Sequence, residues 1–295
     1  MSVSVDDLGP RTKIADGGFG CVYRVPRFRL FGDQDELAYK EFTTDVADQA
    51  RAARASIGLW DRLDRDERRT FGELFAWPRA LVHDASGSVC GLLMPLLGPD
   101  YFIDGAKPKP RDMQWLIASE AQRRASGAGV ADIDLVDRHV LLTKLAYALG
   151  LLHRLRWVYG DLSFKNLVFA LDPPRVKLID CDAAAALSDR GRTQGNTTFW
   201  APPEQAAVPR PLQDTRSDVF KFGLAVLRAL TPGTGAATSY DPGASSASSI
   251  RTGSRWSGGP SPPTPPSARA RRSSTCTWWA CSTAAPSRRT SAARP

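Results

Sequence analysis

The sequence predicts an α+β fold in which a small β-rich region precedes a mainly helical one. Residues 11–42 alternate between polar and apolar positions around a Gly-rich turn, which is typical of strands. Two short apolar runs, at 80–84 and 89–94, are separated by Ala-Ser-Gly-Ser and predict a hairpin. Helical spacing of apolar residues then dominates at 133–155 and 217–230, so the second region should be built mainly from helices.

The remaining elements fill in this outline. Residues 45–75 are rich in Ala, Arg, Asp, Glu and Leu and predict a helix, and 111–119 also has helical spacing. Residues 123–130 contain Arg-Arg-Ala-Ser-Gly-Ala-Gly, which indicates an exposed loop. Residues 158–170 and 176–182 predict short strands and loops, joined by an Asp-Pro-Pro turn.

The composition changes sharply after position 231. Residues 233–295 contain no Leu, Val, Phe, Met, Lys or Glu, so they cannot bury enough apolar surface to offset chain entropy. We expect a disordered Ser/Pro/Arg-rich tail. Two origins are open for it: a genuine extension, or out-of-frame translation of a GC-rich gene. Its eight arginines and single acid contribute +7 of the net charge of +8, so residues 1–232 carry only +1 and a nucleic-acid partner is not expected.

Cysteine usage and the N-terminus bear on location. The five cysteines form no C-x-x-C pair, as in intracellular proteins with reduced thiols. Residues 1–10, read as an N-terminal extension, are acidic and lack the apolar run of a signal peptide. No stretch approaches the ~18 consecutive apolar residues of a membrane span. The sequence therefore predicts a cytoplasmic protein without a membrane partner.

Two N-terminal patterns suit phosphate binding. The first is a Gly-rich segment that includes Ile14, Gly17, Gly18, Phe19, Gly20 and Val22. Closely spaced glycines let backbone amides approach phosphate oxygens, although an ordinary hairpin turn explains the glycines equally well. The second is a predicted strand that ends at Lys40, 20 residues after Gly20. A lysine in a strand is more often simply solvated.

A third pattern combines two acids and an amide. Asp161 and Asn166 lie five residues apart on a loop that follows the long predicted helix, and Asp180 ends an apolar strand fourteen residues after Asn166. Oxygen ligands at loop and strand ends suit Mg²⁺, a hard cation that shares its coordination with phosphates. A capped turn and an unrelated surface carboxylate are the alternative.

In their order and spacing, these motifs resemble the eukaryotic-type protein kinase superfamily over about residues 11–230. Its Gly-rich loop matches Ile14–Val22, with Ala15 in place of the first glycine, and its phosphate-binding lysine matches Lys40. Its catalytic loop matches Tyr159–Asn166, and its Asp-Phe-Gly motif matches Asp180–Asp182. The resemblance implies that Asp161 is the base that orients the substrate hydroxyl, and that Asn166 and Asp180 hold Mg²⁺.

Later motifs continue the resemblance. The Ala-Pro-Glu motif of the family matches Pro202–Glu204, and a following helix with a buried aspartate matches the segment that contains Asp218. Thr197 is expected to touch the catalytic loop. Gly160 stands where many kinases have an arginine that reads a phosphorylated loop, so such phosphorylation is not expected to be the switch. Asp182 replaces a glycine, which suggests a less mobile loop.

The resemblance implies a bilobal protein-kinase-like fold, with an N-lobe at 11–95 and a C-lobe at 96–232 that is truncated. Further helices normally follow, and one supplies an arginine for the glutamate at position 204. Without them, parts of the helix at 217–230 should be uncovered, namely Phe222, Leu224, Val226, Leu227 and Leu230.

The implied activity is Mg²⁺-assisted transfer of the ATP γ-phosphoryl group to a Ser or Thr of a protein. Adenine is expected between Ile14, Val22, Ala38 and Val168, with the connection at 93–96, including Met94, as the hinge. Lys165 could reach the γ-phosphate or be solvated. The glutamate that normally pairs with the lysine is expected at Glu67, with Glu73 second.

Other functions compete with this one. A pseudokinase would keep the fold and the nucleotide site as a binding module without turnover. A small-molecule phosphotransferase of the aminoglycoside type shares a Gly-Asp loop but lacks the segment at 200–204. Phrases at 76–78, 91–95 and 159–163 are similar to bacterial kinases found beside von Willebrand A proteins and PP2C-type phosphatases, which suggests such proteins as partners.

Overall fold

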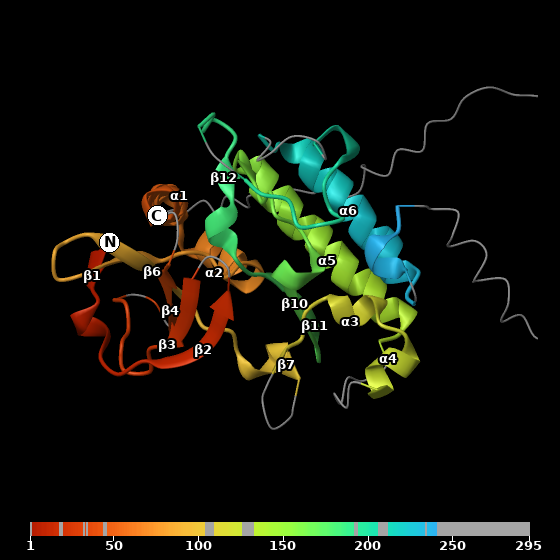
Figure 1. The fold of residues 1–295 in the computed structure, drawn as a ribbon, viewed down its shortest axis with the longest axis horizontal. Helices are drawn as coiled ribbons and strands as arrows, with labels where there is room; N and C mark the ends of the chain where they lie inside the picture. The colour runs from red at the N-terminus through yellow and green to blue at the C-terminus, as the bar shows by residue number, and fades with distance from the viewer. Residues whose placement is uncertain are drawn as a thin grey trace, which may run out of the picture. The chain divides into compact units, whose positions relative to one another are not determined.

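An α+β fold is confirmed, with a six-stranded mixed sheet and several helices. The protein is seen in a computed structural model that describes residues 2–17, 20–31, 33, 35–43, 46–103, 109–125, 133–191, 194–205, 212–233 and 235–240. In Figure 1 the sheet and the two longest later helices occupy different parts of this described region. Among these residues, no helix combines the length and apolar composition that crossing a bilayer requires.

The sheet has the strand order β1-β5-β6-β4-β3-β2 (Figure 1). Its members are β1 (Ser2–Ser4), β2 (Thr12–Gly17), β3 (Gly20–Arg24), β4 (Leu37–Phe42), β5 (Ala80–His83) and β6 (Val89–Pro95). Neighbours are antiparallel except β1, which runs parallel to β5. The predicted hairpin is confirmed as β5–β6. The segment read as an N-terminal extension adds β1 and the short helix η1 (Asp6–Leu8), whose Leu8 is buried.

The region expected to be one helix, 45–75, forms two helices, α1 (Val46–Arg62) and α2 (Arg65–Leu74). The chain breaks because Asp64 caps α2. The Asp64 carboxylate accepts the Glu67 N–H at 2.8 Å, and the Glu67 carboxylate accepts the Asp64 N–H at 2.9 Å. This reciprocal capping box satisfies amide groups that a helix start leaves without partners.

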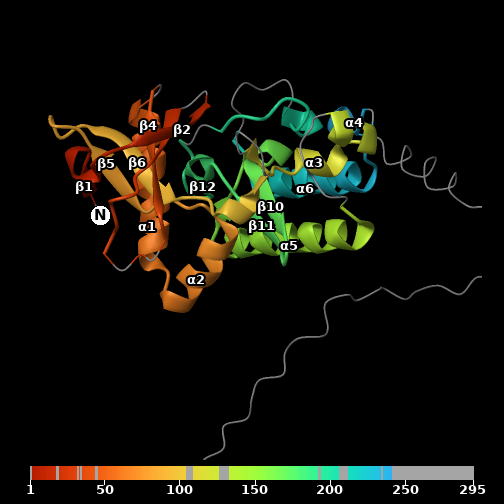
Figure 2. The ribbon, with the colours of Figure 1, turned by 90° about the horizontal axis from the view of Figure 1, so that it is seen from below.

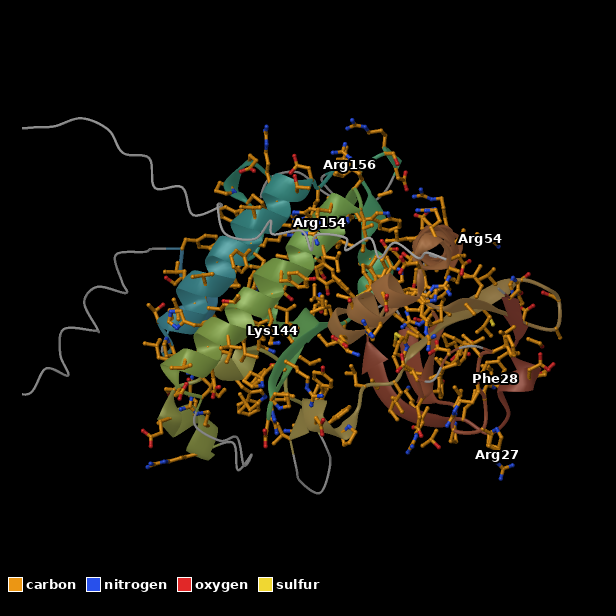
Figure 3. The ribbon with its side chains drawn as sticks, turned by 180° about the vertical axis from the view of Figure 1, so that it is seen from behind. Arg27, Phe28, Arg54, Lys144, Arg154 and Arg156 are labelled. Atoms are coloured by element: carbon orange, nitrogen blue, oxygen red, sulfur yellow. The ribbon has the colours of Figure 1, made fainter. Side chains whose placement is uncertain are left out.

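The helical region contains α3 (Gln114–Ile117), α4 (Glu120–Ala125), α5 (Leu135–Arg154) and α6 (Thr215–Leu230). Helices α5 and α6 run side by side in Figures 1 and 2, and they are in contact. The expected loop at 123–130 is wrong at its start, where residues 123–125 end α4; residues 126–130 lie outside the described residues. Lys144 and Arg154 lie along α5, and Arg54 lies on α1 (Figure 3).

Short strands connect these helices. They are β7 (Phe102–Ile103), β8 (Lys109–Pro110), β9 (Trp157–Val158), β10 (Leu167–Leu171), β11 (Pro174–Leu178) and β12 (Ala185–Ala186). Strands β10 and β11 form an antiparallel hairpin, and β12 pairs with β9. The hairpin contacts α5 on one side through β11, so the loops at its ends are held at fixed positions.

The described chain continues past α6, into the segment expected to be tail. The short helix η6 (Ala236–Thr238) and the residues around it pack against α6. The buried Arg228 of α6 donates to the carbonyl of Ser239 at 3.2 Å and stacks on Tyr240 at 5.4 Å. The expected tail therefore begins with residues that cover part of α6. Residues 241–295 lie outside the described residues.

The expectation that α6 is partly uncovered is confirmed for four side chains and wrong for one. Phe222, Val226, Leu227 and Leu230 are each partly exposed, whereas Leu224 is buried in the main core.

Trp77 joins the two regions of the fold. Its fully buried ring makes edge contacts with Phe71 of α2 and Trp157 of β9, at centroid distances of 4.9 and 5.5 Å. Its indole N–H donates to the Ser56 carbonyl of α1 at 2.8 Å. One side chain thus connects both N-terminal helices with the strand that leads into the loop at 159–166.

Trp77→Ala is expected to lower the free energy of unfolding by about 3–5 kcal/mol, because it removes a large buried ring and leaves a cavity. Phe31→Ala is the matched control, since Phe31 is 98% exposed, and should change stability by less than about 0.5 kcal/mol. Urea unfolding followed by tryptophan fluorescence and circular dichroism measures both. Similar losses in the two variants would contradict the described core.

Candidate functional site

One face of the sheet gathers the residues expected to line a nucleotide. Side chains alternate along β4, so Ala38 and Lys40 point to the same face. Val22 of β3 is directly opposite Lys40, and Met94 of β6 is directly opposite Ala38. Directly paired residues share a face. The sheet register therefore brings four of the predicted residues together on one surface.

The Gly-rich segment is described in part. Gly17 ends β2 and Gly20 begins β3, whereas Gly18 and Phe19 lie outside the described residues. Ile14 is at a register shift between β2 and β3 and is 49% exposed. A Cβ at position 20 would overlap the backbone carbonyl of Glu41, so close packing on β4 is one reason for a glycine there.

Lys40 reaches from the sheet to the loop after β11. Its buried Nζ lies 2.8 and 3.0 Å from the two carboxylate oxygens of Asp182, and 3.4 Å from Oδ1 of Asp180. Burial alone would lower the pKa of Lys40, but the charges of Asp182 and Asp180 outweigh it and raise that pKa well above its usual value. The lysine is therefore a cation fixed between two carboxylates.

The predicted pairing of Lys40 with Glu67 is wrong in this structure. Glu67 is exposed, and its carboxylate is engaged in the capping box with Asp64. Glu73, the second choice, is also exposed. The spacing Asp-x-x-Glu at the start of a helix is the signal of a capping box, and it explains this glutamate without a role at Lys40.

Sequence reasoning missed Asp182 as the partner of Lys40. The signal that could have found it is the second acid of Asp180-Cys181-Asp182, at a position where the resemblance expects glycine. The side chain of Asp182 is only 11% exposed, whereas that of Asp180 is 53% exposed. The two acids thus differ: one is buried against the lysine, and the other faces solvent with most of its surface.

Asp161 is held on both sides by hydrogen bonds. Its Oδ2 accepts from Nδ2 of Asn166 at 2.9 Å, and its Oδ1 accepts from the hydroxyl and the N–H of Thr197 at 2.7 and 3.1 Å. The expected contact between Thr197 and this loop is confirmed. These bonds fix the carboxylate orientation while leaving lone pairs for a further donor.

Asn166 and Asp180 are brought together by the backbone. The N–H of Ile179 donates to the carbonyl of Asn166 at 2.9 Å, so Asp180 follows directly on a residue that is bonded to Asn166. The hydroxyl of Tyr159 also donates to the carbonyls of both Asn166 and Ile179. Asp180 then turns the chain with φ of 54°, a left-handed conformation that aspartate tolerates better than most residues.

A buried aspartate of α6 holds the loop at 159–166 in place. The Asp218 carboxylate, expected to be buried and fully so here, accepts the N–H groups of Tyr159 and Gly160, each at 2.9 Å. Nε2 of His153 lies 2.9 Å from the same carboxylate. Gly160 has φ of 82°, and a Cβ there would overlap the side chain of Gln194, so a glycine is required for two reasons.

Two predicted residues lie elsewhere. Val168 is fully buried in a cluster with Tyr101 and Ala170, next to the connection that leaves β6. Lys165 is exposed, and its charge acts on Asp112. Burial raises the pKa of the Asp112 carboxyl, and the charge of Lys165 acts to lower it. Among the described residues, neither Val168 nor Lys165 is seen to contact Lys40 or Asp180.

The donor set fits one kind of metal site. Both amide hydrogens of Asn166 are used on Asp161, through its carboxylate and its carbonyl, which leaves Oδ1 of Asn166 for a cation. Asp180, which directly follows the residue bonded to the Asn166 carbonyl, offers a half-exposed carboxylate. Within the described residues, no group of three or more His, Cys, Asp or Glu side chains could hold a metal. Two oxygen ligands suit Mg²⁺, which keeps waters and substrate phosphates in its other positions.

The charges of the site favour a bound cation. Lys40 is one positive charge, and Asp161, Asp180 and Asp182 are three negative ones, which leaves a formal charge of −2. A divalent cation would balance this excess and could then bind an anion.

Compared with known proteins, the sequence matches no protein-family model, and no curated protein matches it.

A buried lysine of α6 also contacts the loop at 159–166. The Nζ of Lys221 in α6 donates to the Gly160 carbonyl and, at 2.7 Å, to Oε1 of Gln213. Burial lowers the pKa of Lys221 to about 8, although the charges of Asp161 and Asp218 act to raise it. The folded chain therefore releases this proton at a lower pH than the unfolded chain, whose lysines titrate near 10.4.

The contribution of Lys221 to stability should rise with pH from about 8 to about 10.4, because in that window the unfolded chain binds more protons at this lysine than the folded chain. Between pH 7 and 9.5 the gain from Lys221 is about 2 kcal/mol. Lys221→Met should remove this gain. Urea unfolding of both proteins across this pH range measures the difference, and parallel pH profiles would show that the site is wrongly described.

Proposed function

We propose that this chain is an ATP-dependent protein serine/threonine kinase, with a bilobal protein-kinase-like fold and an incomplete C-terminal lobe. One observation carries the proposal. A continuous set of contacts runs from Lys40 to Asp180, from Asp180 through Ile179 to Asn166, and from Asn166 to Asp161. These side chains come from separate segments, and they supply the charges that phosphoryl transfer requires.

Each residue has a chemical role in this proposal. Bound ATP would supply the transferable γ-phosphoryl group, and Mg²⁺ would neutralise the phosphate charge. Asp180 and Oδ1 of Asn166 would hold the metal, and Lys40 would bind phosphate oxygens as a fixed cation. The sheet face with Val22, Ala38 and Met94 would contact the adenine, because it is apolar and adjoins Lys40.

Asp161 would position the acceptor hydroxyl and accept its proton. The bonds from Thr197 and Asn166 hold its carboxylate in one orientation, which is a condition for precise alignment.

The role of Lys165 is not supported by a contact with Lys40 or Asp180. Its exposure beside Asp112 favours solvation or contact with a protein substrate.

A polypeptide acceptor is favoured by the segment that follows Thr197. Trp200 is buried against Phe164 of the Asp161 loop, at a ring distance of 5.0 Å, and stacks on Arg228 of α6 at 4.5 Å. This packing fixes a stretch of chain beside Asp161 that could receive an extended peptide. The aminoglycoside-type alternative was expected to lack such a segment.

The resemblance alone supports von Willebrand A proteins or PP2C-type phosphatases as partners.

A nucleotide-binding module without turnover is the second candidate. Glu204, at the end of the Trp200 segment, is exposed, and no ion pair is seen for it among the described residues. The arginine expected to anchor it would belong to further helices, which the composition of residues 233–295 does not predict. The site residues could then bind nucleotide while the acceptor segment lacks its full support.

Transfer of ³²P from [γ-³²P]ATP with Mg²⁺, to the chain itself or to a generic protein substrate, tests the proposal. Asp161→Asn should lower the rate by at least about 100-fold, because it removes the base, while ATP binding measured by calorimetry persists. Asp66→Asn, an exposed change on α2, is the matched control and should leave the rate unchanged.

The outcomes separate the candidates. ATP binding without transfer by the folded wild-type chain would reject the kinase and favour the binding module. Absence of both binding and transfer would reject both. Equal transfer rates in the wild type and Asp161→Asn would show that this carboxylate is not the base.

A further inference from the structure

Helix α1 offers no carboxylate to Lys40. It lies against β5, β6 and the short helix η4 (Cys181–Ala183), so it is the helix next to the lysine-bearing face of the sheet. Its only acids are Asp48 and Asp61, and both are exposed. The buried residues of α1 are small or apolar, namely Ala50, Ala53, Ser56, Ile57 and Leu59. The helix therefore packs on this region without an ionic contact to Lys40.

Asp182 makes the contact that α1 does not make. Both of its oxygens lie within 3.0 Å of Nζ of Lys40, and its side chain is nearly buried. A two-oxygen contact restrains the position of an ammonium group more strongly than a single one. Asp180 is more distant, at 3.4 Å, and more exposed, so it can turn toward a metal without releasing the lysine.

We propose that Asp182 is the positioning residue for Lys40, so that the orientation of the lysine is set by the metal-binding loop itself and not by α1. The inference rests on the proposed function, because it assigns a role in binding phosphates. It deepens that function by naming how the site is controlled: anything that shifts the loop at 180–183 moves the lysine and the metal ligand together.

Within the described residues, α1 makes an ion pair that points in another direction. Arg51 lies 2.8 Å from Asp189 and donates to the Gly191 carbonyl at 3.1 Å, beyond the metal-binding loop. This pair is half exposed and fixes α1 to the following segment. Displacement of α1 alone should therefore leave Lys40 engaged with Asp182.

The test compares two Asp→Asn changes by calorimetry of the full chain in the presence of Mg²⁺, with ATP and with adenosine. Asp182→Asn should weaken ATP binding by about tenfold and leave adenosine binding unchanged, because only ATP carries phosphates for Lys40 to hold. Asp189→Asn is the matched control and removes the carboxylate that Arg51 contacts. It should change neither affinity.

A second variant covers the case in which Asp182→Asn does not fold. Asp182→Glu keeps the charge but moves the carboxylate, so ATP binding should weaken by a smaller factor while adenosine binding persists. Equal losses for ATP and adenosine would indicate a merely structural role and overturn the proposal, as would unchanged ATP affinity in both Asp182 variants. Failure of the wild type to bind ATP would instead overturn the proposed function, and this role with it.

Discussion

The loop that carries Asp161 depends on the carboxylate of Asp218. This group is fully buried, and the backbone amides of Tyr159 and Gly160 donate to it. A carboxylate without partners at that depth would be very unfavourable, and the same is true of the two amides. Each side therefore requires the other, and together they fix the loop to α6. Lys221 and Gln213 extend the constraint, since Gln213 also donates to the Gly195 carbonyl at 2.6 Å.

A second constraint acts across the site. The sheet delivers one buried cation, Lys40, and the loop after β11 delivers two acids. A buried ion pair gives little net stability, because desolvation offsets attraction, but breaking it leaves an expensive charge behind. Its value here is geometric: it fixes the lysine close to a carboxylate that can also bind a cation. The proposed phosphoryl transfer depends on that juxtaposition.

Much of this arrangement could be predicted from local sequence. Most strands, the hairpin and the long helices follow from periodicity, and the spacing led us to expect Asp161, Asn166 and Asp180 to converge. The partner of Lys40 was missed, because an ion pair is chosen by tertiary packing and several acids were available, although the second acid at Asp182 was a signal. Glu67 is committed to a local capping box, a pattern visible in the sequence but overlooked beside the stronger resemblance. The place of residues 2–4 in the sheet was missed because this strand is only three residues long, too short for its alternation to stand out.

The central claim is that Asn166 and Asp180 hold a divalent cation together with a nucleotide. Paramagnetic broadening by Mn²⁺ tests it most directly, with amide NMR signals recorded with and without a non-hydrolysable ATP analogue. With the analogue present, the signals of residues 166 and 180 and of their neighbours should broaden at low Mn²⁺ concentrations, before those of exposed acids such as Asp66. Broadening that is the same with and without the analogue, or that spares these two residues, would contradict the account.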